Sequence, residues 1–388
     1  MIFAAADDGA EPRATPLYAA AASLCATNAW TSVNGWAVAR SYTDTVEEYE
    51  AASKDVALVD LGPLCRYTVR GKEAAAFIAR LTSCPTAEIA VAESARGLVL
   101  DADGFVIDRA DATRLSNDLF LLTTSAPIDR RLQIAARGFD IEIANIAGMV
   151  GALGLFGPKA RDAAAAAGVD ILAAEATAQG RVRGVELAVR PVSIGALAGI
   201  EVIFPAEDAL VIWERIRRKR KLPAIGLDAL EILRIEGGVP RTGVDFVNAD
   251  EARSPLEART PDEIGLPHLA PPNRAWFNGR RAMKNAGRAR RRLVLLSVDC
   301  DVAPAGAAIR TRAGAVGAVT SAAFSPKLKR VLCFADVDPN AALLDIEAVA
   351  APDGGRAPGR LWETYESRLA AAFRENLKSA TDFAGSRV

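Results

Sequence analysis

The side chains that most often carry out chemistry in proteins are scarce in this chain. The single histidine, His268, lies in a segment rich in proline, LPHLAPP. One histidine excludes metal sites built from several imidazoles, and a serine or cysteine nucleophile activated by histidine would have to use this one. We expect His268 to lie in a loop with a structural role, and a contact with the substrate is the alternative.

The cysteines do not indicate a site by their spacing. There are five, at positions 25, 65, 84, 300 and 333, and no two are separated as in CxxC. An odd number without that spacing suggests neither a disulfide framework nor a zinc site, so we expect no metal. We expect Cys65 and Cys84 to be buried structural thiols, and the alternative is that they line a pocket.

Composition narrows the class of protein further. The chain has 388 residues, of which 51% are hydrophobic, and 47 basic side chains stand against 48 acidic ones, for a net charge of −1. This balance argues against a nucleic-acid or membrane-surface protein, because both need an excess of Lys and Arg. No apolar run reaches the roughly 18 residues of a membrane span. The start of the chain is acidic rather than basic, so we expect no secretion signal and a cytoplasmic protein.

The spacing of apolar residues predicts the same series of elements twice. The first series has strands at 56–60 and 66–70, a helix at 72–81 and a β-meander at 97–124. The second has a strand at 150–156, a helix at 159–167, strands at 186–193 and 200–204, and a helix at 206–218. A repeated strand–helix–strand order favours two similar α+β halves over a doubly wound parallel sheet.

The last hundred residues follow a different pattern. Short strands with glycine turns, at 292–298, 307–310, 316–320 and 331–336, are typical of a small β-barrel. The segment Leu361–Ala380 has apolar residues four apart, as in an amphipathic helix that packs on its own domain. We therefore predict a weakly ordered or late-packing segment at 1–35, two α+β subdomains within 36–285, a barrel at 286–350 and a helical tail at 351–388.

Eight regions of the sequence, in order, resemble motifs of the aminomethyltransferase family, which includes the glycine cleavage T-protein and folate-dependent demethylases. They extend over roughly residues 36 to 345 and include DGFVID, FGPKA, LRIEGG and SPLEA. The matching positions are Val59–Leu61 with Val69–Ala74, Asp103–Asp108, Phe156–Ala160, Gly199–Val202 with Pro205–Asp208, Leu233–Gly238, Ser254–Ala258, Phe277–Arg280, and Gly317–Ser321 with Ser325 and Pro326.

The resemblance implies an α+β fold with three domains in a cloverleaf, in which two intertwined ferredoxin-like domains are joined by a C-terminal β-barrel. It also implies tetrahydrofolate as the cofactor, held in a central channel. The family's essential aspartate corresponds to Asp108, its pterin-binding glutamate to Glu201, and its arginine near the folate to Arg234.

These residue types suit the implied roles. The carboxylate of Asp108 can orient or deprotonate a reacting amine, and that of Glu201 can accept two N–H bonds from the amino-pyrimidine edge of a pterin. Arg234 offers a planar fork to a carboxylate. The structural alternatives are a surface carboxylate for Asp108, an exposed strand residue for Glu201, and for Arg234 a salt bridge with Glu231 or Glu236.

Several departures from the family pattern bear on the substrate. The family's YTGE is replaced by Ile194–Leu197, its second aspartate by Arg109, and the histidine of its DVSH motif is missing. Losing polar groups around the donor site suggests a substrate larger and more apolar than an aminomethyl group.

We therefore expect a tetrahydrofolate-dependent demethylase that acts on a small O- or N-methyl compound, aromatic ones included. One alternative is a folate-independent lyase that releases formaldehyde from a hydroxymethyl-bearing aromatic compound. Another is a folate-binding protein without catalysis. The expected partner is a small molecule, with no nucleic acid and no membrane, and a homodimer is one candidate for the assembly.

Overall fold

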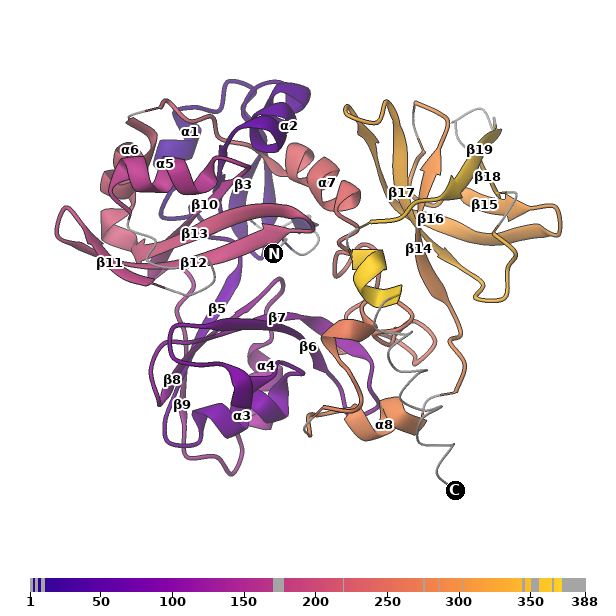
Figure 1. The fold of residues 1–388 in the computed structure, drawn as a ribbon, viewed down its shortest axis with the longest axis horizontal. Helices are drawn as coiled ribbons and strands as arrows, with labels where there is room; N and C mark the ends of the chain where they lie inside the picture. The colour runs from indigo at the N-terminus through magenta and orange to yellow at the C-terminus, as the bar shows by residue number, and fades with distance from the viewer. Residues whose placement is uncertain are drawn as a thin grey trace. The chain divides into compact units, whose positions relative to one another are not determined.

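The computed structural model divides the chain into two compact units (Figure 1). Unit 1 comprises Met1–Val99 and Asp108–Leu233, and unit 2 comprises Leu100–Ile107 and Arg234–Val388. The structure describes residues 3, 6–7, 11–169, 178–218, 220–274, 276–285, 287–301, 303–343, 346–349, 356–364 and 366–371. Residues 234–285 group with the C-terminal unit, whereas the boundary predicted at residue 285 stays a prediction.

The first sheet of unit 1 contains the hairpin that carries Asp108. Its strand order is β6-β7-β8-β5-β9, with β5 at Cys65–Arg70, β6 at Ser94–Leu100, β7 at Val106–Arg114, β8 at Leu119–Thr124 and β9 at Glu142–Asn145. Helix α3 (Ala74–Leu81) contacts β8 and buries Ala74, Phe77, Ile78 and Leu81, which recur at the spacing of one helix face. Helix α4 (Asp129–Ala135) and the 3₁₀ turn η1 (Thr86–Glu88) complete this half.

The second sheet of unit 1 carries Glu201. Its order is β11-β12-β13-β10-β4, with β4 at Ala57–Asp60, β10 at Val150–Phe156, β11 at Ala178–Val182, β12 at Val185–Ile194 and β13 at Leu197–Pro205. Helices α5 (Ala160–Ala167) and α6 (Ala209–Arg218), the latter preceded by η2 (Ala206–Asp208), contact β13 and bury their apolar faces. Strand β4 comes from the first half of the sequence, so the two halves are intertwined as expected.

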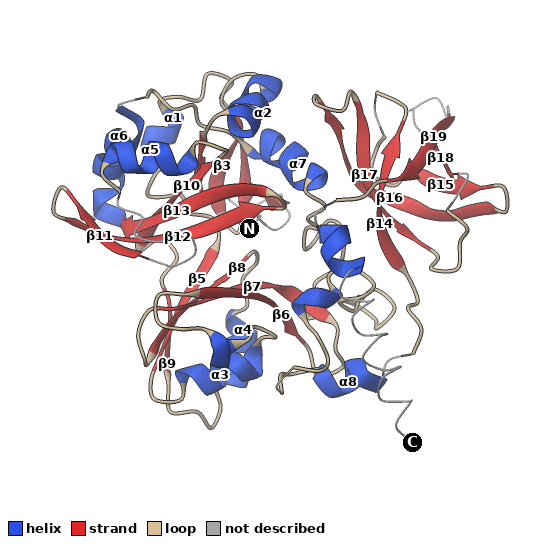
Figure 2. Cartoon of the chain, viewed as in Figure 1, coloured by secondary structure: helices blue, strands red, loops and turns tan. Residues whose placement is uncertain are grey.

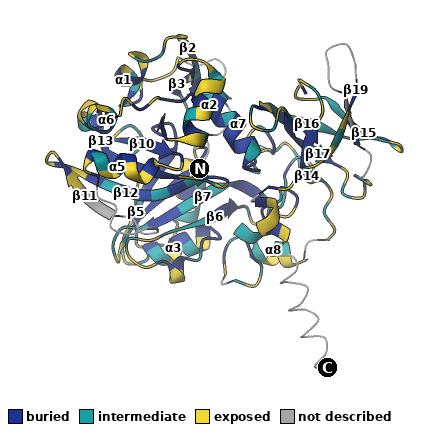
Figure 3. Ribbon diagram, turned by 45° about the horizontal axis from the view of Figure 1, so that its top comes forward, coloured by how far each residue is buried: buried dark blue, intermediate teal, exposed yellow. Residues whose placement is uncertain are grey.

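The two sheets of unit 1 face one another, and the helices cover their outer sides (Figure 2). Strands on both facing surfaces are mainly buried (Figure 3). Helix α2 (Thr45–Lys54) also contacts β4. Asp44 caps the start of this helix, because its side chain accepts hydrogen bonds from the backbone amides of Val46 and Glu47. Side chains that project between the sheets are therefore withdrawn from water.

The N-terminal segment is more ordered than we predicted. Strands β1 (Ala6–Asp7), β2 (Ala29–Val33) and β3 (Trp36–Ser41) form a small sheet, and α1 (Tyr18–Ala22) packs beside it. Leu17, Ala20 and Ala21 join the core of unit 1. The expectation of weak order is wrong for these residues, because their apolar side chains pack into the core of the second sheet, whereas late packing stays a prediction.

Unit 2 contains a closed barrel, as predicted. Its order is β14-β17-β16-β15-β18-β19, with β14 at Arg292–Val298, β15 at Ala308–Thr311, β16 at Gly314–Ser325, β17 at Arg330–Val337, β18 at Ile346–Val349 and β19 at Arg356–Leu361. The last strand lies within the segment predicted as a helical tail, so the barrel extends beyond residue 350. Helical turns begin only at residue 366, and the predicted helix beyond residue 371 lies outside the described residues.

The turn between β6 and β7 belongs to unit 2. Gly104 has φ +83°, and a Cβ there would lie 2.8 Å from the side chain of Met283. The side chain of Asn278 donates to the carbonyl of Leu100, and the amide of Val106 donates to the carbonyl of Arg259. These contacts hold the turn, which ends four residues before Asp108, and the first residue of β7.

The remaining helices are short. They are α7 (Leu227–Glu236), η3 (Pro267–Leu269) and α8 (Arg280–Asn285). Among the residues that the structure describes, no helix is both long and apolar enough to cross a bilayer.

Candidate functional site

Asp108 is a buried carboxylate on β7. Its Oδ2 accepts hydrogen bonds from the backbone amides of Ser125 (2.7 Å) and Ala126 (2.8 Å), which follow the end of β8. Bonds from two rigid backbone donors fix the orientation of this carboxylate. The alternative of a surface carboxylate at the turn is therefore wrong.

Cys65 is close to this carboxylate. The register of β5 and β8 places Cys65 opposite Thr124, one residue before the amides that bind Asp108. Burial, and then the negative charge of Asp108, raise the pKa of the Cys65 thiol to about 12. The thiol is therefore protonated at neutral pH and is a poor nucleophile.

Glu201 lies on β13 with no exposed surface, between two arginines of unit 1. Its Oε1 accepts from Nη2 of Arg66 at 2.5 Å, and its Oε2 accepts from Nε of Arg190. Burial would raise the pKa of this carboxyl, but the positive charges of Arg190 and Arg66 outweigh it and lower the pKa to about 2. Glu201 is therefore ionised throughout the neutral range, and the alternative of an exposed strand residue is wrong.

The two arginines connect the facing sheets. From β12, Arg190 reaches the first sheet, where Nη1 donates to the hydroxyl of Thr113 (3.2 Å) and Nη2 to that of Thr123 (3.1 Å). From β5, Arg66 reaches Glu201 and also donates Nη1 to two backbone carbonyls, those of residues 61 and 64. Both arginine side chains are buried, with 1% and 2% exposure. We call Arg66, Arg190 and Glu201 the arginine–glutamate cluster.

A cavity of about 280 Å³ lies beside this cluster. Arg190 forms part of its wall, together with Ser94–Arg96, Asp111 and Pro191–Ser193. Arg96 donates to the hydroxyl of Ser193 at 2.7 Å and lies 3.5 Å from the carboxylate of Asp111. The cavity therefore combines a small apolar surface with two arginines and one aspartate, a lining suited to a small organic molecule.

A second, much smaller cavity extends toward Asp108. Its volume is about 10 Å³, it shares Arg96 and Asp111 with the larger cavity, and it is also lined by Arg109 and Thr123–Ser125. Ser125 donates to Asp108, so this cavity ends at the residues that position the carboxylate. The Arg109 that replaces an acidic residue of the family pattern therefore lines the approach to Asp108.

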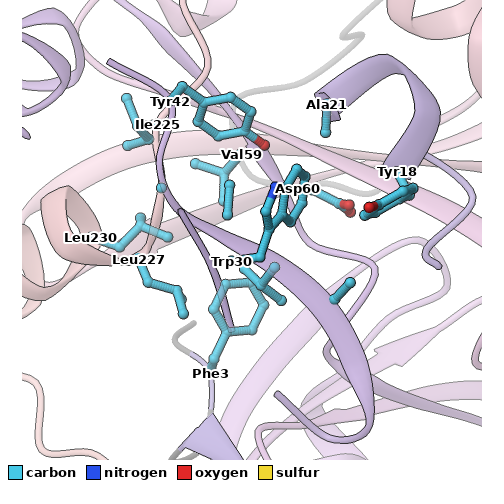
Figure 4. A pocket seen from close by; sticks show the side chains of 14 residues that line it. Phe3, Tyr18, Ala21, Trp30, Tyr42, Val59, Asp60, Ile225, Leu227 and Leu230 are labelled. Carbon is cyan, nitrogen blue, oxygen red and sulfur yellow. The ribbon is translucent and has the colours of Figure 1, made fainter. Parts of the chain in front are cut away.

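Asp60 is a third acid of interest, half-buried in a different part of unit 1. It accepts from the hydroxyl of Thr15 (2.6 Å) and the amide of Gly62 (2.8 Å), and burial raises its pKa. Aromatic rings of the N-terminal segment, including Tyr18 and Trp30, surround it (Figure 4). The cavity there holds only about 10 Å³, room for about one water molecule, so Asp60 serves to hold the N-terminal segment.

Arg234 belongs to unit 2, where its side chain is fully buried. Its Nη1 pairs with Asp245 at 2.7 Å, and its Nη2 donates to the hydroxyl of Ser321 at 2.7 Å. Asp245 in turn accepts from the hydroxyls of Thr320 and Ser321 on β16. The guanidinium thus joins α7 to the barrel, and its partner is a residue that the sequence did not single out.

His268 lies in η3 of unit 2, within the predicted loop. Its Nε2 is 3.1 Å from the carboxylate of Glu366, and its Nδ1 is buried with no hydrogen-bond partner among the described residues. Of the predicted thiols, Cys65 and Cys84 are both buried. Within the described residues, no three His, Cys, Asp or Glu side chains gather as they would around a metal ion.

Sequence reasoning identified the acids of the site but missed the arginines that bind them. Asp108 and Glu201 were singled out, and both project within unit 1, whereas Arg234 belongs to unit 2. Sequence analysis does not single out Arg66 or Arg190. Arg190 is the one basic residue of the mainly apolar strand β12, and a basic residue in such a strand requires an anionic partner when it is buried, so for Arg190 a signal is present in the sequence.

Comparisons with known proteins now identify the family. Residues 21–260 match the family described as the GCVT N-terminal domain, and residues 291–364 match the glycine cleavage T-protein C-terminal barrel domain. The chain belongs to the GCVT family. The barrel match extends to residue 364, in agreement with the position of β19 in the structure.

Relatives of the GCVT family align along most of the chain. An aminomethyltransferase of Thermus thermophilus is 29% identical over 336 residues, covering 84% of this chain and 92% of the relative. One of Staphylococcus haemolyticus is 27% identical over 315 residues, covering 78% and 84%. The crystal structure of the glycine cleavage system aminomethyltransferase T from Bartonella henselae superimposes with a TM-score of 0.80 over 91% of this chain and 98% of that one, at 20% identity. This structural similarity shows that the two chains share the same fold.

The arginine–glutamate cluster tests whether tetrahydrofolate suits this GCVT chain. Both oxygens of Glu201 bind planar N–H donors, one from each arginine, which is the pattern that an amino-pyrimidine edge would present. Glu201 is thus an acceptor of the right chemistry, but both of its oxygens are held by the buried guanidinium groups of Arg66 and Arg190 and the side chain has no exposed surface. In this structure the cluster therefore offers the amino-pyrimidine edge no open acceptor.

Proposed function

We propose that this member of the GCVT family is a tetrahydrofolate-dependent one-carbon transferase that demethylates a small O- or N-methyl compound. The observation that carries the proposal is Asp108, a buried carboxylate fixed by two backbone amides, one of them from Ser125, which lines a small cavity of unit 1. Family membership supports the reaction class, and the relatives named above are aminomethyltransferases. Within this proposal the protein acts in the cytoplasm on a small molecule.

The chain's own residues would divide the work between binding and proton transfer. When bound, tetrahydrofolate would supply the nucleophilic nitrogen that accepts the one-carbon group. Asp108 would hold or remove a proton at the reacting nitrogen and stabilise positive charge that develops there. The role of Glu201 in holding the amino-pyrimidine edge stays a prediction, since its two oxygens bind Arg66 and Arg190 in the structure. The role of Arg234 near the folate stays a prediction, since its guanidinium binds Asp245 and Ser321 in the structure.

The larger cavity supports a donor bigger than an aminomethyl group. Its volume of about 280 Å³ is close to the lower limit for small-molecule sites, about 300 Å³. Pro191 and Val192 provide an apolar wall, and Arg96 and Ser193 provide polar groups. We include aromatic methyl ethers among the candidate donors, because a planar ring with one polar substituent matches this combination.

The decisive experiment compares Asp108→Asn with Asp103→Asn. Asp103 is exposed in the turn of the same hairpin, so its amide variant controls for the loss of one charge. A panel of O- and N-methyl compounds is incubated with tetrahydrofolate, and methylated folate is measured by chromatography. The Asp108 variant should lose about 10²-fold or more in turnover, as expected for a group that transfers a proton, and the Asp103 variant should match the wild type.

Other products would identify the alternatives. Formaldehyde released in the absence of folate would favour the folate-independent lyase, and the occupation of Glu201 by Arg190 is the observation that favours this reading. Folate binding without turnover of any donor would favour a binding protein. Full activity in Asp108→Asn would contradict the proposed role of this carboxylate.

A further inference from the structure

The β6–β7 turn, which precedes Asp108, contacts a second turn of the same unit. Leu100–Ile107 belongs to unit 2, as does Phe277–Arg280, a segment that matches a family motif but has no role in the proposed function. The side-chain amide of Asn278 donates to the carbonyl of Leu100 at 2.8 Å. Phe277 is buried, with 3% exposure, so the second turn is itself anchored in unit 2.

Two glycines allow the backbones of these turns to approach closely. Gly279 has φ +78°, and a Cβ there would lie 2.5 Å from the carbonyl oxygen of Asp101 and 2.9 Å from the Cα of Gly104. Gly104 has φ +83°, and a Cβ there would lie 3.2 Å from the carbonyl oxygen of Gly279. A side chain at Gly279 would therefore force the two turns apart by about 1 Å, the difference between 2.5 Å and an ordinary contact of 3.4 Å.

Backbone hydrogen bonds extend this support to the start of β7. Val106 donates its amide to the carbonyl of Arg259 at 2.8 Å, and its own carbonyl accepts from the amide of Ala249 at 3.0 Å. Asp108 follows two residues later, and the pairing of β7 with β8 begins two residues after that, at Ala110. Two residues of strand span only about 7 Å. The main chain therefore transmits a displacement of the β6–β7 turn to Asp108.

The carboxylate of Asp108 is sensitive to a displacement of this size. Its Oδ2 accepts from the amides of Ser125 at 2.7 Å and Ala126 at 2.8 Å. A shift of about 1 Å would lengthen both separations beyond the range of a hydrogen bond. Misplacing a reacting group by about 1 Å can lower a rate on the order of 10²-fold. The contact between the two turns therefore bears on the chemistry proposed for Asp108.

We propose that Asn278 and Gly279 are positioning residues, which set the location of Asp108 through the β6–β7 turn. This inference rests on the proposed function, because it takes Asp108 as the carboxylate that handles the proton. Asn278 and Gly279 act through the backbone of Leu100–Ile107 rather than through contact with the substrate. The conserved chemistry of the hairpin and the segment Phe277–Arg280 thus belong to one device.

Hydrogen exchange in the full chain tests the positional link without turnover. Mass spectrometry follows the amides of Ser125 and Ala126, and Asp108→Ala gives their exchange rate when no carboxylate holds them. In Gly279→Ala these two amides should exchange about 10-fold faster than in the wild type, or more, because the new Cβ displaces the β6–β7 turn. Gly306→Ala is the matched control: it has φ +83° in unit 2, and its Cβ would meet nothing within 4 Å. It should exchange like the wild type.

Turnover supplies a second readout. With tetrahydrofolate and the methyl donor that the panel of O- and N-methyl compounds identifies, Gly279→Ala should lower kcat about 10²-fold and leave KM within about 3-fold of the wild type. Asn278→Ala removes one hydrogen bond and creates no clash, so it should lower kcat about 10-fold. Asn340→Ala is its control, because Asn340 is an exposed asparagine of unit 2, and it should keep the wild-type kcat.

The outcomes separate this inference from the proposed function. Wild-type exchange at Ser125 and Ala126 in both Asn278→Ala and Gly279→Ala overturns the inference and leaves the proposed function intact. Faster exchange at these two amides, with unchanged exchange in the rest of β8, supports the positional link, whereas a general loss of stability would accelerate exchange throughout unit 1 and overturn it. If the wild type turns over no donor, the proposed function fails and the exchange result still decides the link. If Gly279→Ala does not fold, Asn278→Ala carries the test.

Discussion

Replacing Glu201 by glutamine should destabilise unit 1 severely. The substitution keeps the shape of the side chain but leaves Arg66 and Arg190 buried beside one another without a counter-charge. Removing one partner of a buried ion pair costs about 3–5 kcal/mol of unfolding free energy. The pKa of Glu201 gives a consistent value, because a fall from 4.5 to about 2 corresponds to about 3 kcal/mol of stabilisation of the folded state.

The pKa also determines the pH range of this effect. A carboxyl whose pKa is lower in the folded state contributes its full stabilisation above its unfolded value, near 4.5, and loses it as the pH falls toward 2. The difference in unfolding free energy between the wild type and Glu201→Gln should therefore be constant near neutral pH. It should shrink steadily below about pH 4.5, because protonation makes the wild-type side chain neutral as well.

Thermal and urea unfolding of the two proteins, followed by circular dichroism at pH 7 and pH 3, measure this difference. We expect the midpoint of thermal unfolding at pH 7 to fall by about 6–20 °C in Glu201→Gln, because each kcal/mol of lost stability lowers this midpoint by about 2–4 °C. Glu186→Gln is the matched control, since its pair with Arg181 is largely exposed (79% and 65%), and it should change stability by less than about 0.5 kcal/mol. A cost at Glu201 no larger than that at Glu186 would refute the reasoning.

Two further predictions concern other buried groups. Asp245→Asn should destabilise unit 2 by about 3–5 kcal/mol, because it leaves the buried guanidinium of Arg234 without its ionic partner, and this would show as a lower urea midpoint than in the wild type. Normal stability of this variant would mean that other groups compensate the charge. Burial raises the pKa of both Cys65 and Cys333 to about 12, so iodoacetamide at pH 8 should leave these thiols unmodified in the folded protein and label them after denaturation, as mapped by mass spectrometry. Rapid labelling of either thiol in the native state would contradict their burial.

The elements that the sequence predicted best are those with strong local signals. The bounds of β10 and β14 agree with the expected strands at 150–156 and 292–298, because each is a continuous apolar run that ends at a clear change of composition. The last barrel strand was missed because its sequence, RAPGRL, contains a proline and a glycine, which are rare in strand interiors. Its pairing with β14 and β18 outweighs that local preference.

The site was only half predictable for a related reason. Motif resemblance located Asp108 and Glu201, since each follows a recognisable local pattern. The partners of Glu201 depend on pairings between distant parts of the chain, and Arg66 precedes it by 135 residues. Nothing in the local sequence of Arg66 indicates which acid it binds. The contacts of Glu201 therefore follow from how the two sheets of unit 1 face one another, and not from the local sequence around either arginine.

The assignment of the β6–β7 turn to unit 2 has a consequence for biosynthesis. The groups that hold this turn, at Arg259, Asn278 and Met283, are translated more than 150 residues after it. A nascent chain that has emerged as far as the end of α7 can form both sheets of unit 1 but still lacks these supports. Domains usually fold in the order in which they leave the ribosome. Here the residues next to Asp108 reach their final conformation only after much of the second unit has been synthesised. Because Leu100–Ile107 belongs to unit 2 but interrupts the sequence of unit 1, a single recombination crossover cannot exchange one whole unit between relatives.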